Sequence, residues 1–415
     1  MIDLKLLKDK PEIIKAELTA RNIKLDFELL LSLNKARREL ASEIDNLKAA
    51  WPKFKAKPHI NELEKLRQIK ANLAKKEKEL KKVKQGFNKL YFQLPNIHDQ
   101  STPVSKDETG NIEIKKWGQP KEFDFQLKSH DQILEALDLV EIKQAAEVSG
   151  ARFWYLKNDL VRLQFGLMMW LLDKLTKKGF TPLITPVLVK KPAMFGTGFF
   201  PAEKNEYYKV ENQADDDNDN LYLVGTAEVA LASLHGGQTI ITPKLYVGYS
   251  SCFRKEAGTY GKDLAGIFRG HQFDKMEMLV FCSPSESSVW HEKLLSLNEE
   301  IWQELNVPYR VLNMCTGDIG AANAKKYDLE GWFPGQNKYR ELVSCSNDTD
   351  FQARRLSVKF KTGGKKTYAH TLNTTAMAFG RSMACLLENY QQADGSVKIP
   401  AVLHKYCDVK EIRKD

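Results

Sequence analysis

The chain lacks the features that mark secreted and membrane proteins. Its 415 residues contain 6 cysteines and no Cys-x-x-Cys pair, which favours free thiols in a reducing cytosol over disulfides or a thiolate zinc site. The most apolar helical segment, residues 165–172, is far shorter than the roughly 20 residues that cross a bilayer. Charged residues also interrupt the first nine positions, where a signal peptide has an apolar run. We therefore expect a cytoplasmic protein that binds no zinc and meets no membrane.

Positive charge is distributed unevenly along the chain. Residues 1–100 contain 23 Lys and Arg against 14 Asp and Glu, an excess that equals the net charge of +9 of the whole chain. A basic segment joined to a neutral body indicates contact with a polyanion, most simply a nucleic acid. A solvated helical surface is the alternative that charge alone leaves open.

Two apolar stripes with helical spacing run through this basic segment. The first comprises Leu29, Leu33, Ala36, Leu40, Ile44, Leu47 and Trp51, and the second comprises Leu66, Ile69, Leu73, Leu80, Val83, Phe87, Leu90 and Leu94, interrupted only at Lys76. Pro52 and Pro58 end the first helix and allow a tight reversal. The sequence therefore predicts an antiparallel two-helix coiled coil over about residues 26–94, an arm roughly 45 Å long.

Basic residues lie off the seam of this predicted arm, where they are free to meet phosphates. The candidates are Lys48, Lys53, Lys55, Lys57, Arg67, Lys70 and Lys78. A structural or dimerising coiled coil is the competing interpretation. Beyond the arm, helical and strand-like stretches alternate irregularly, which is typical of an α+β domain. We expect two domains, residues 1–103 with the arm and residues 104–415.

A strand-like pair with a Gly-rich connection carries the most informative motif. Arg254 and Glu256 alternate out of one run, and Phe273 begins the next. Side chains repeat every two residues along a strand, so Arg254 and Glu256 are expected on one face. A guanidinium beside a carboxylate can hold a phosphate together with the hydrogen-bond donors of a base or an amine.

Five further segments of the sequence carry distinctive patterns. A long apolar helix and a strand ending in proline span residues 160–186. A strand of small residues, 373–378, passes into a helix that presents Arg381, and small residues let a nucleotide approach the backbone. Three more stretches are Gly225-Thr226-Ala227-Glu228, His271-Gln272-Phe273-Asp274-Lys275-Met276-Glu277, and Arg340-Glu341-Leu342-Val343-Ser344-Cys345-Ser346-Asn347.

Together these segments resemble motifs 1, 2 and 3 and neighbouring sequences of class II aminoacyl-tRNA synthetases, and the seryl-tRNA synthetase family in particular. The resemblance covers essentially the whole chain. It implies an antiparallel sheet flanked by helices, a catalytic domain at 104–415, and an N-terminal arm that grips tRNA. It also implies a homodimer, because motif 1 builds the dimer interface in this family.

The resemblance further implies residue roles. The serine-binding residues would be Thr226, Ala227, Glu228, Arg254, Glu277, Asn373 and Thr375. The ATP-binding residues would be Arg254, Lys255, Glu256, Arg269, Phe273, Glu341, Leu342, Val343, Ser344 and Arg381. Glu341 and Ser344 would hold the Mg²⁺ that accompanies ATP, since both offer hard oxygen donors. Thr374 departs from the family pattern, in which many members have glycine, and a side chain there would be expected to crowd the pocket.

The implied reaction joins L-serine to the 3′ end of serine tRNA through a seryl-adenylate, and selenocysteine tRNA is expected to be served alike. Two alternatives remain at this stage. One is a paralogue that activates an amino acid and loads a carrier protein, and the other is a non-catalytic nucleic-acid-binding scaffold. The basic arm argues against the first, and the presence of Arg254, Glu277 and Arg381 argues against the second.

Overall fold

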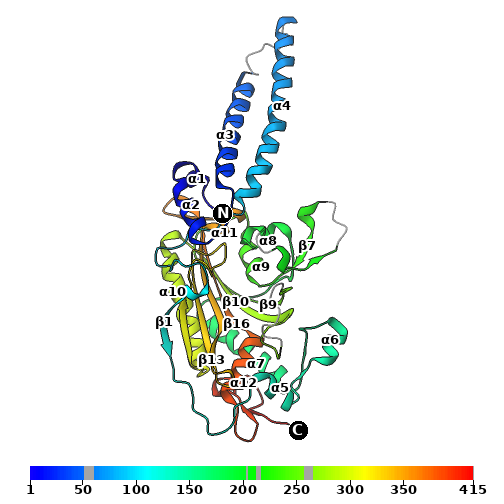
Figure 1. The fold of residues 1–415 in the computed structure, drawn as a ribbon, viewed down its shortest axis with the longest axis vertical. Coiled ribbons are helices and arrows are strands. Elements are labelled where there is room, and N and C mark those ends of the chain that lie inside the picture. Colours follow the sequence, from blue (N-terminus) through cyan, green and yellow to red (C-terminus); the bar gives the residue numbers. More distant parts are fainter. Residues whose placement is uncertain (51–59, 202–203, 212–215, 257–264, 415) are drawn as a thin grey trace. The chain divides into compact units, whose positions relative to one another are not determined.

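The computed structural model describes residues 1–50, 60–201, 204–211, 216–256 and 265–414 (Figure 1). The chain divides into an N-terminal unit, Ile2–Pro95, and a C-terminal unit, Asn96–Asp415 together with Met1. The division thus lies at Pro95, upstream of the boundary expected after residue 103. All six cysteines are buried and free, as expected. Within the described ranges, no helix combines the length and the apolarity needed to cross a membrane.

The N-terminal unit contains the predicted coiled coil. Its helices are α1 (Leu4–Asp9), α2 (Pro11–Ala20), α3 (Phe27–Ala50) and α4 (Ile60–Tyr91), and α3 and α4 lie side by side (Figure 1). The predicted α4 stripe from Leu66 to Leu94 is half-buried or buried, while the positions between are mostly exposed. On α3 one expected position is wrong: Leu29 is exposed, and its neighbour Leu30 is buried instead.

Ion pairs cross from one helix of the coiled coil to the other. Lys76, the charged residue that interrupts the stripe, pairs with Glu43, and Lys48 Nζ lies 3.0 Å from Glu77 Oε1. Nearer the start of α3, the guanidinium of Arg37 lies 4.9 Å from the centre of the Phe87 ring, near the end of α4. An earlier residue of α3 thus faces a later residue of α4, which confirms the antiparallel arrangement. A charge in the seam is tolerated because its partner lies on the facing helix.

An eight-stranded sheet organises the C-terminal unit. Its order is β1-β11-β12-β13-β16-β10-β9-β4, and every pairing is antiparallel except that of β4 with β9. The strands are β1 (Ile112–Trp117), β4 (Thr181–Ile184), β9 (Lys244–Phe253), β10 (Gln272–Cys282), β11 (Tyr309–Asn313), β12 (Lys325–Phe333), β13 (Lys338–Thr349) and β16 (His370–Ala378). The α+β fold with a large antiparallel sheet is therefore confirmed.

Helices cover this sheet unequally. One face carries the main core, in which α7 (Asp159–Lys177), α10 (Ser287–Glu304) and α12 (Phe379–Tyr390) pack on apolar strand residues. The other face is covered over part of its area by α9 (Glu228–Ser233) and α11 (Phe351–Leu356), next to α8 (Lys191–Thr197). The uncovered part of that second face presents polar side chains.

Smaller elements complete the C-terminal unit. They are α5 (His130–Ala136), α6 (Lys143–Ser149), β2 (Val140–Glu141), β3 (Tyr155–Leu156), β5 (Leu188–Lys190), β6 (Lys209–Val210), β7 (Leu221–Leu223), β8 (Thr239–Ile240), β14 (Lys359–Thr362), β15 (Lys365–Tyr368), β17 (Val397–Lys398) and β18 (Glu411–Ile412).

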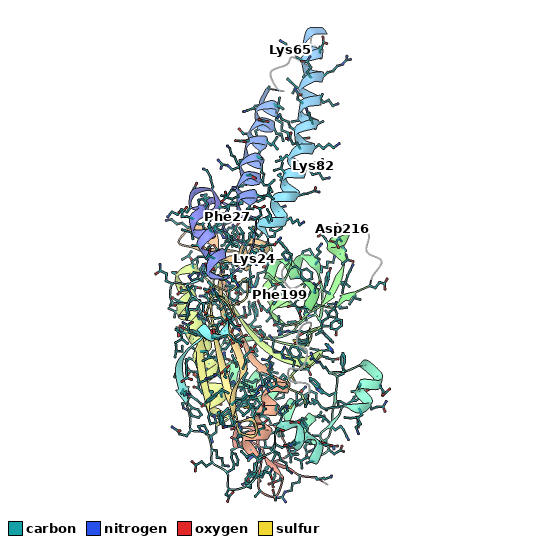
Figure 2. All side chains as sticks on the ribbon, viewed as in Figure 1. Lys24, Phe27, Lys65, Lys82, Phe199 and Asp216 are labelled. Atoms are coloured by element: carbon teal, nitrogen blue, oxygen red, sulfur yellow. The ribbon has the colours of Figure 1, made fainter. Side chains whose placement is uncertain are left out.

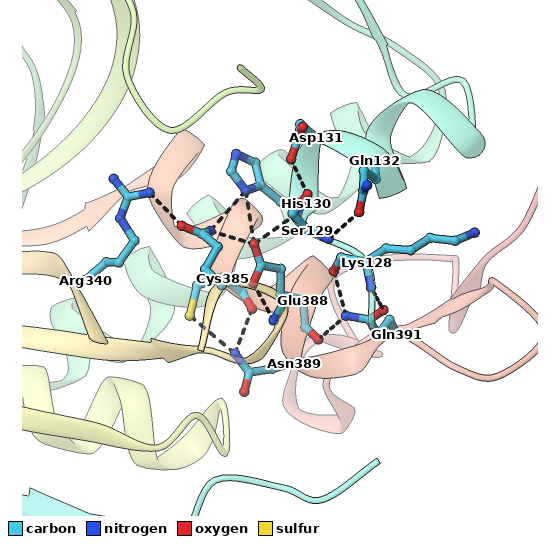
Figure 3. Close-up of polar contacts among 12 residues, drawn as sticks. Lys128, Ser129, His130, Asp131, Gln132, Arg340, Cys385, Glu388, Asn389 and Gln391 are labelled. Atoms are coloured by element: carbon cyan, nitrogen blue, oxygen red, sulfur yellow. Dashed lines mark hydrogen bonds and ion pairs between the residues drawn. The ribbon is translucent and has the colours of Figure 1, made fainter. Parts of the chain in front are cut away.

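The buried carboxylate of Glu388 connects three segments that are far apart in the sequence (Figure 3). Glu388 of α12 is fully buried. Its Oε1 accepts hydrogen bonds from the backbone N–H of His130 at 3.0 Å and from Nε2 of Gln336 at 2.7 Å, and its Oε2 accepts from the N–H of Gly335 at 3.0 Å. Gln336 in turn accepts from Arg340 Nη1 at 2.8 Å. One side chain therefore holds the start of α5, the turn before β13 and the end of α12.

Replacing Glu388 with Ala should lower the free energy of unfolding of the C-terminal unit by about 2–5 kcal/mol. Removal of the carboxylate leaves several buried donors without an acceptor, and each such group costs roughly 1–3 kcal/mol. Urea denaturation followed by tryptophan fluorescence would measure the change. Glu135→Ala on the exposed side of α5 is the matched control and should change stability by less than about 0.5 kcal/mol. Equal effects of the two variants would contradict this account.

Candidate active site

Two cavities adjoin on the polar part of the sheet. The arginine cavity, of about 270 Å³, is lined by residues that include Arg254, Glu256, Phe268, Arg269, Phe273, Glu341, Leu342, Thr375 and Arg381. The acidic cavity, of about 200 Å³, is lined by residues that include Phe199, Thr226, Glu228, Glu277, Asn323, Ser346 and Asn373. Arg254, Lys275, Lys326 and Ser344 line both cavities. The two cavities therefore share a junction rich in positive charge.

The hairpin of β9 and β10 positions Arg254 at this junction. The register pairs Cys252 with Phe273, and two contacts hold Arg254 just beyond the end of β9. The N–H of Arg254 donates to the carbonyl of His271 at 3.0 Å, and its side-chain Nε donates to the carbonyl of Gly225 at 3.2 Å. The guanidinium carbon lies 5.4 Å from the centre of the Phe273 ring. Arg254 is thus fixed on two sides before any substrate arrives.

Glu256 and Arg269 meet across the loop ends of the same hairpin. Arg269 Nη1 lies 2.6 Å from Glu256 Oε2, and both residues line the arginine cavity. Glu256 has a φ of +50°, in the left-handed region that non-glycine residues seldom adopt. The ion pair holds this carboxylate against the cavity wall. Two residues to which the sequence assigned separate roles therefore contact each other.

Glu341 and Arg381 form the opposite wall of the arginine cavity. Arg381 Nη1 lies 3.0 Å from Glu341 Oε2, and its guanidinium carbon is 5.1 Å from the centre of the Phe268 ring. The charges of Arg381 and Lys326 lower the pKa of Glu341 below its usual value. The carboxylate is therefore ionised, and Ser344 adds a hydroxyl to the same cavity. This pair of hard oxygen donors fits a Mg²⁺ ion.

Two carboxylates, Glu228 and Glu277, line the acidic cavity together with the cations of the shared wall. Glu228, at the start of α9, accepts a hydrogen bond from Gln352 Nε2 at 2.6 Å. Its pKa is raised well above the usual value by burial and by the neighbouring charges of Asp348 and Glu277. Glu277 Oε2 lies 2.5 Å from Lys275 Nζ. An ammonium group bound beside Glu228 would favour its ionised form and so offset the effect of burial.

Strand alternation in β16 separates three neighbouring polar residues. Asn373 lines the acidic cavity, and its Nδ2 donates to Asp348 Oδ2 at 3.0 Å. Thr375 lines the arginine cavity rather than the acidic one. Thr374 is fully buried and points to the other face, where its hydroxyl donates to the carbonyl of Ser344 at 2.9 Å and accepts from Asn298 Nδ2 at 2.6 Å. The expected crowding of the pocket by Thr374 is therefore wrong.

Three of the expected site residues line neither cavity. Ala227 and Val343 are buried in the hydrophobic cores on opposite faces of the sheet. Lys255 is exposed, with its ammonium 5.6 Å from the centre of the Tyr208 ring. Each of these residues adjoins one that does line a cavity, so only some side chains of each motif reach the cavities.

Several cavity residues were not singled out from the sequence. They include Phe268, Lys275, Asn323, Lys326 and Ser346. A signal existed for Lys275, which lies two positions before Glu277 and so was a candidate for the same face. No local pattern distinguishes Lys326 from the adjacent Lys325, because only the sheet register decides which of the two faces the cavities.

Basic side chains on the arm are solvent-exposed. Arg67, Lys70 and Lys78 are exposed along α4, as are Lys65 and Lys82 on the same helix (Figure 2). Lys48 is also exposed but is paired with Glu77. Lys53, Lys55 and Lys57 lie outside the described residues. These cations of α4 are therefore accessible to a polyanion.

Comparison with known proteins gives the same picture for both units. The model of the seryl-tRNA synthetase N-terminal domain matches residues 1–98, and that of the tRNA synthetase class II core domain (G, H, P, S and T) matches residues 208–390. The serine–tRNA ligase of Nitrosopumilus maritimus is 42% identical, with 99% of this chain and 100% of that protein covered. The serine–tRNA ligase of Pyrococcus horikoshii is 41% identical, with 99% and 97% covered.

Solved structures agree with these sequence comparisons. The crystal structure of seryl-tRNA synthetase from P. horikoshii complexed with ATP superposes with a TM-score of 0.91 at 41% identity, with 100% of both chains covered. The cytoplasmic serine–tRNA ligase of Naegleria fowleri in complex with AMP gives 0.86 at 33% identity, with 99% and 97% covered. Full-length similarity at this level, on top of two matched domains, shows that the chain belongs to the seryl-tRNA synthetase family of class II aminoacyl-tRNA synthetases.

Proposed function

We propose that the arginine cavity binds ATP and the acidic cavity binds L-serine, so that the α-phosphate and the serine carboxylate meet beside Arg254. The observation that carries this proposal is the shared wall of Arg254, Lys275, Lys326 and Ser344 between the two cavities. Seryl-adenylate joins a seryl group to AMP, so it would span the junction with its seryl group in the acidic cavity and its adenylate in the arginine cavity. The ATP complex of the P. horikoshii relative supports the nucleotide assignment.

The acidic cavity suits an amino acid with a small hydroxyl side chain. Glu228 and Glu277 supply negative charge for the ammonium and acceptors for the hydroxyl, with Thr226 and Asn373 completing the wall. A pocket that hydrogen-bonds the hydroxyl rejects alanine, because its buried polar groups would be left unpaired. Threonine is excluded only because the pocket lacks room for its extra methyl group. A steric difference of this size discriminates by only about 1–3 kcal/mol.

The arginine cavity suits a nucleoside triphosphate. Phe273 offers a face for the adenine ring, and Glu256 accepts from the adenine amino group, while Arg269 and Arg381 bind the outer phosphates. Glu341 and Ser344 would hold Mg²⁺, which neutralises phosphate charge when bound. Each arginine already touches a carboxylate, at 2.6 Å for Arg269 and 3.0 Å for Arg381. These contacts hold both guanidinium groups at the cavity wall.

The chemistry then needs no protein nucleophile. A serine carboxylate oxygen attacks the α-phosphorus, and the bond to the β-phosphate oxygen breaks with release of pyrophosphate. A ribose hydroxyl at the tRNA 3′ end next attacks the seryl carbonyl, and AMP leaves. The protein contributes positioning and electrostatic stabilisation. The exposed cations of the arm contact the phosphates of serine tRNA, and of selenocysteine tRNA, by shape and charge rather than by base stacking.

We also propose that the protein acts in the cytoplasm as a homodimer. All six cysteines are free thiols, which suits a reducing compartment. The motif 1 elements expose apolar side chains: Phe165 and Met169 on α7 and Ile184 on the edge strand β4 are 56%, 46% and 87% exposed. Such a group of large apolar side chains is typical of a subunit interface.

Replacing Arg254 with Ala should lower kcat/KM of serine-dependent ATP–pyrophosphate exchange by at least about 100-fold, because a preorganised charge at the reacting phosphate is lost. Exchange would be measured with each of the twenty amino acids and no tRNA. The wild type should respond to serine alone, whereas a response to another amino acid, or to none, would favour the alternatives above. Arg413→Ala, at an exposed arginine paired with Glu411, should behave as wild type.

Replacing Arg67, Lys70 and Lys78 together with Gln should raise KM for tRNA roughly tenfold and flatten its salt dependence, because three phosphate contacts are lost. Serine activation without tRNA should not change. Aminoacylation at several salt concentrations would measure both effects. The same triple change at the exposed Lys143, Lys177 and Lys361 of the C-terminal unit is the control, and an equal loss there would argue against the arm.

Replacing Ile184 with Lys should convert the dimer to a monomer, because a charge would be buried in an apolar interface. Sedimentation velocity would report the mass. Ile241 is 70% exposed but lies outside the motif 1 elements, so Ile241→Lys should leave the dimer intact. A wild-type protein that sediments as a monomer would contradict the proposed dimer.

A further inference from the structure

Lys326 lies at the junction of the two cavities. The sequence assigned it no role. It lies near the start of β12 and lines both the arginine cavity and the acidic cavity. The register of β12 with β13 pairs Lys326 with Ser346 and Asp328 with Ser344. Since paired residues share a face of the sheet, all four side chains belong to the polar face that carries the site.

The ammonium of Lys326 is held in place by Asp328. Its Nζ lies 3.0 Å from Oδ1 and 3.1 Å from Oδ2 of that carboxylate. The Lys326 and Asp328 side chains are only 17% and 7% exposed. A charged donor is therefore fixed at the junction before any substrate arrives.

Lys326 approaches the junction from the side opposite Arg254. Arg254 follows β9, whereas Lys326 lies in β12, and the strands β10, β16 and β13 separate these two strands in the sheet. Lys275, the other lysine of the shared wall, lies in β10, between these two strands, and pairs with Glu277. Arg254 and Lys326 are thus the cations that can flank a group at the junction from both sides.

We propose that Lys326 is a catalytic residue of serine activation, contacting the α-phosphate oxygens opposite Arg254 while the carboxylate attacks. This inference rests on the assignment of ATP and serine to the two cavities. The bond between a serine carboxylate oxygen and the α-phosphorus forms, and the bond from that phosphorus to the bridging oxygen breaks, with the electron pair leaving on pyrophosphate. No proton moves to or from Lys326. Its fixed charge offsets the negative charge that builds on the α-phosphate oxygens.

The test compares Lys326→Met with Lys325→Met in ATP–pyrophosphate exchange. Lys325 is the preceding residue of β12 and points to the other face, with its ammonium 4.8 Å from the centre of the Tyr327 ring. Lys326→Met should lower kcat by about 100- to 1,000-fold, the usual loss for one preorganised donor. KM for serine should change less than kcat. Lys325→Met should exchange as wild type, and Lys326→Arg should recover part of the rate because it restores the charge.

A second pair of variants separates catalysis from structure. Lys326→Met leaves Asp328 buried without its partner, which could destabilise the fold. The double variant Lys326→Met, Asp328→Asn removes both charges and should regain the melting temperature lost in the single variant. Exchange should nevertheless stay low, because the ammonium is still missing. Recovery of exchange in the double variant would show that Lys326 only balances Asp328, and would overturn the proposal.

The outcomes also distinguish this inference from the proposed function. Serine-dependent exchange in the wild type, with Lys326→Met within about threefold of it, would reject the role of Lys326 and leave the cavity assignments intact. A wild type that shows no serine-dependent exchange would reject both. Retained kcat with a raised KM for serine would likewise overturn the proposal, because it would place Lys326 in ground-state binding.

Discussion

The register of β10 between β9 and β16 is the constraint on which the site depends. It pairs Phe273 with Cys252, which places Arg254 just beyond the strand, and it pairs Glu277 with Thr375. The pairing of β10 with β16 shifts between Met276 and Glu277. A slip of one residue would turn every side chain to the other face. Glu277 would then enter the main core, and its apolar neighbours Met276 and Met278 would enter the cavity.

Apolar packing on the far face is what prevents that slip. Met276, Met278 and Val280 of β10 are fully buried in the main core, and burial of each such side chain contributes roughly 1.5–3 kcal/mol. This apolar burial keeps the register in place even though crowding charged side chains on the polar face lowers the stability of the fold. Carboxylates and cations crowd there as Glu277 with Lys275, Glu341 with Arg381 and Asp328 with Lys326. Because positive and negative side chains alternate, a small volume holds many charges.

The sequence predicted those parts of the protein in which local pattern decides the outcome. The stripes of the coiled coil follow helical spacing over many residues, so both helices were predictable, although Leu29 and Leu30 were confused by one position. Arg254, Glu256, Phe273 and Arg381 were predictable because each sits in a motif whose order along the chain is distinctive. Contacts between distant segments were not predictable. Glu388 joins His130, Gln336 and Gly335, and nothing near any one of these residues indicates the others.

The sequence by itself determined the family, the arm and the residue types that the reaction needs, because spacing and motif order are properties of the chain alone. Tertiary structure decided which of two adjacent residues serves the site. Thr374 faces the core while Asn373 and Thr375 face the cavities, and we place Lys326 rather than Lys325 at the junction on the same ground. The physical reason is that successive side chains of a strand point to opposite faces. The identity of each face is fixed only when the neighbouring strands and covering helices are in place.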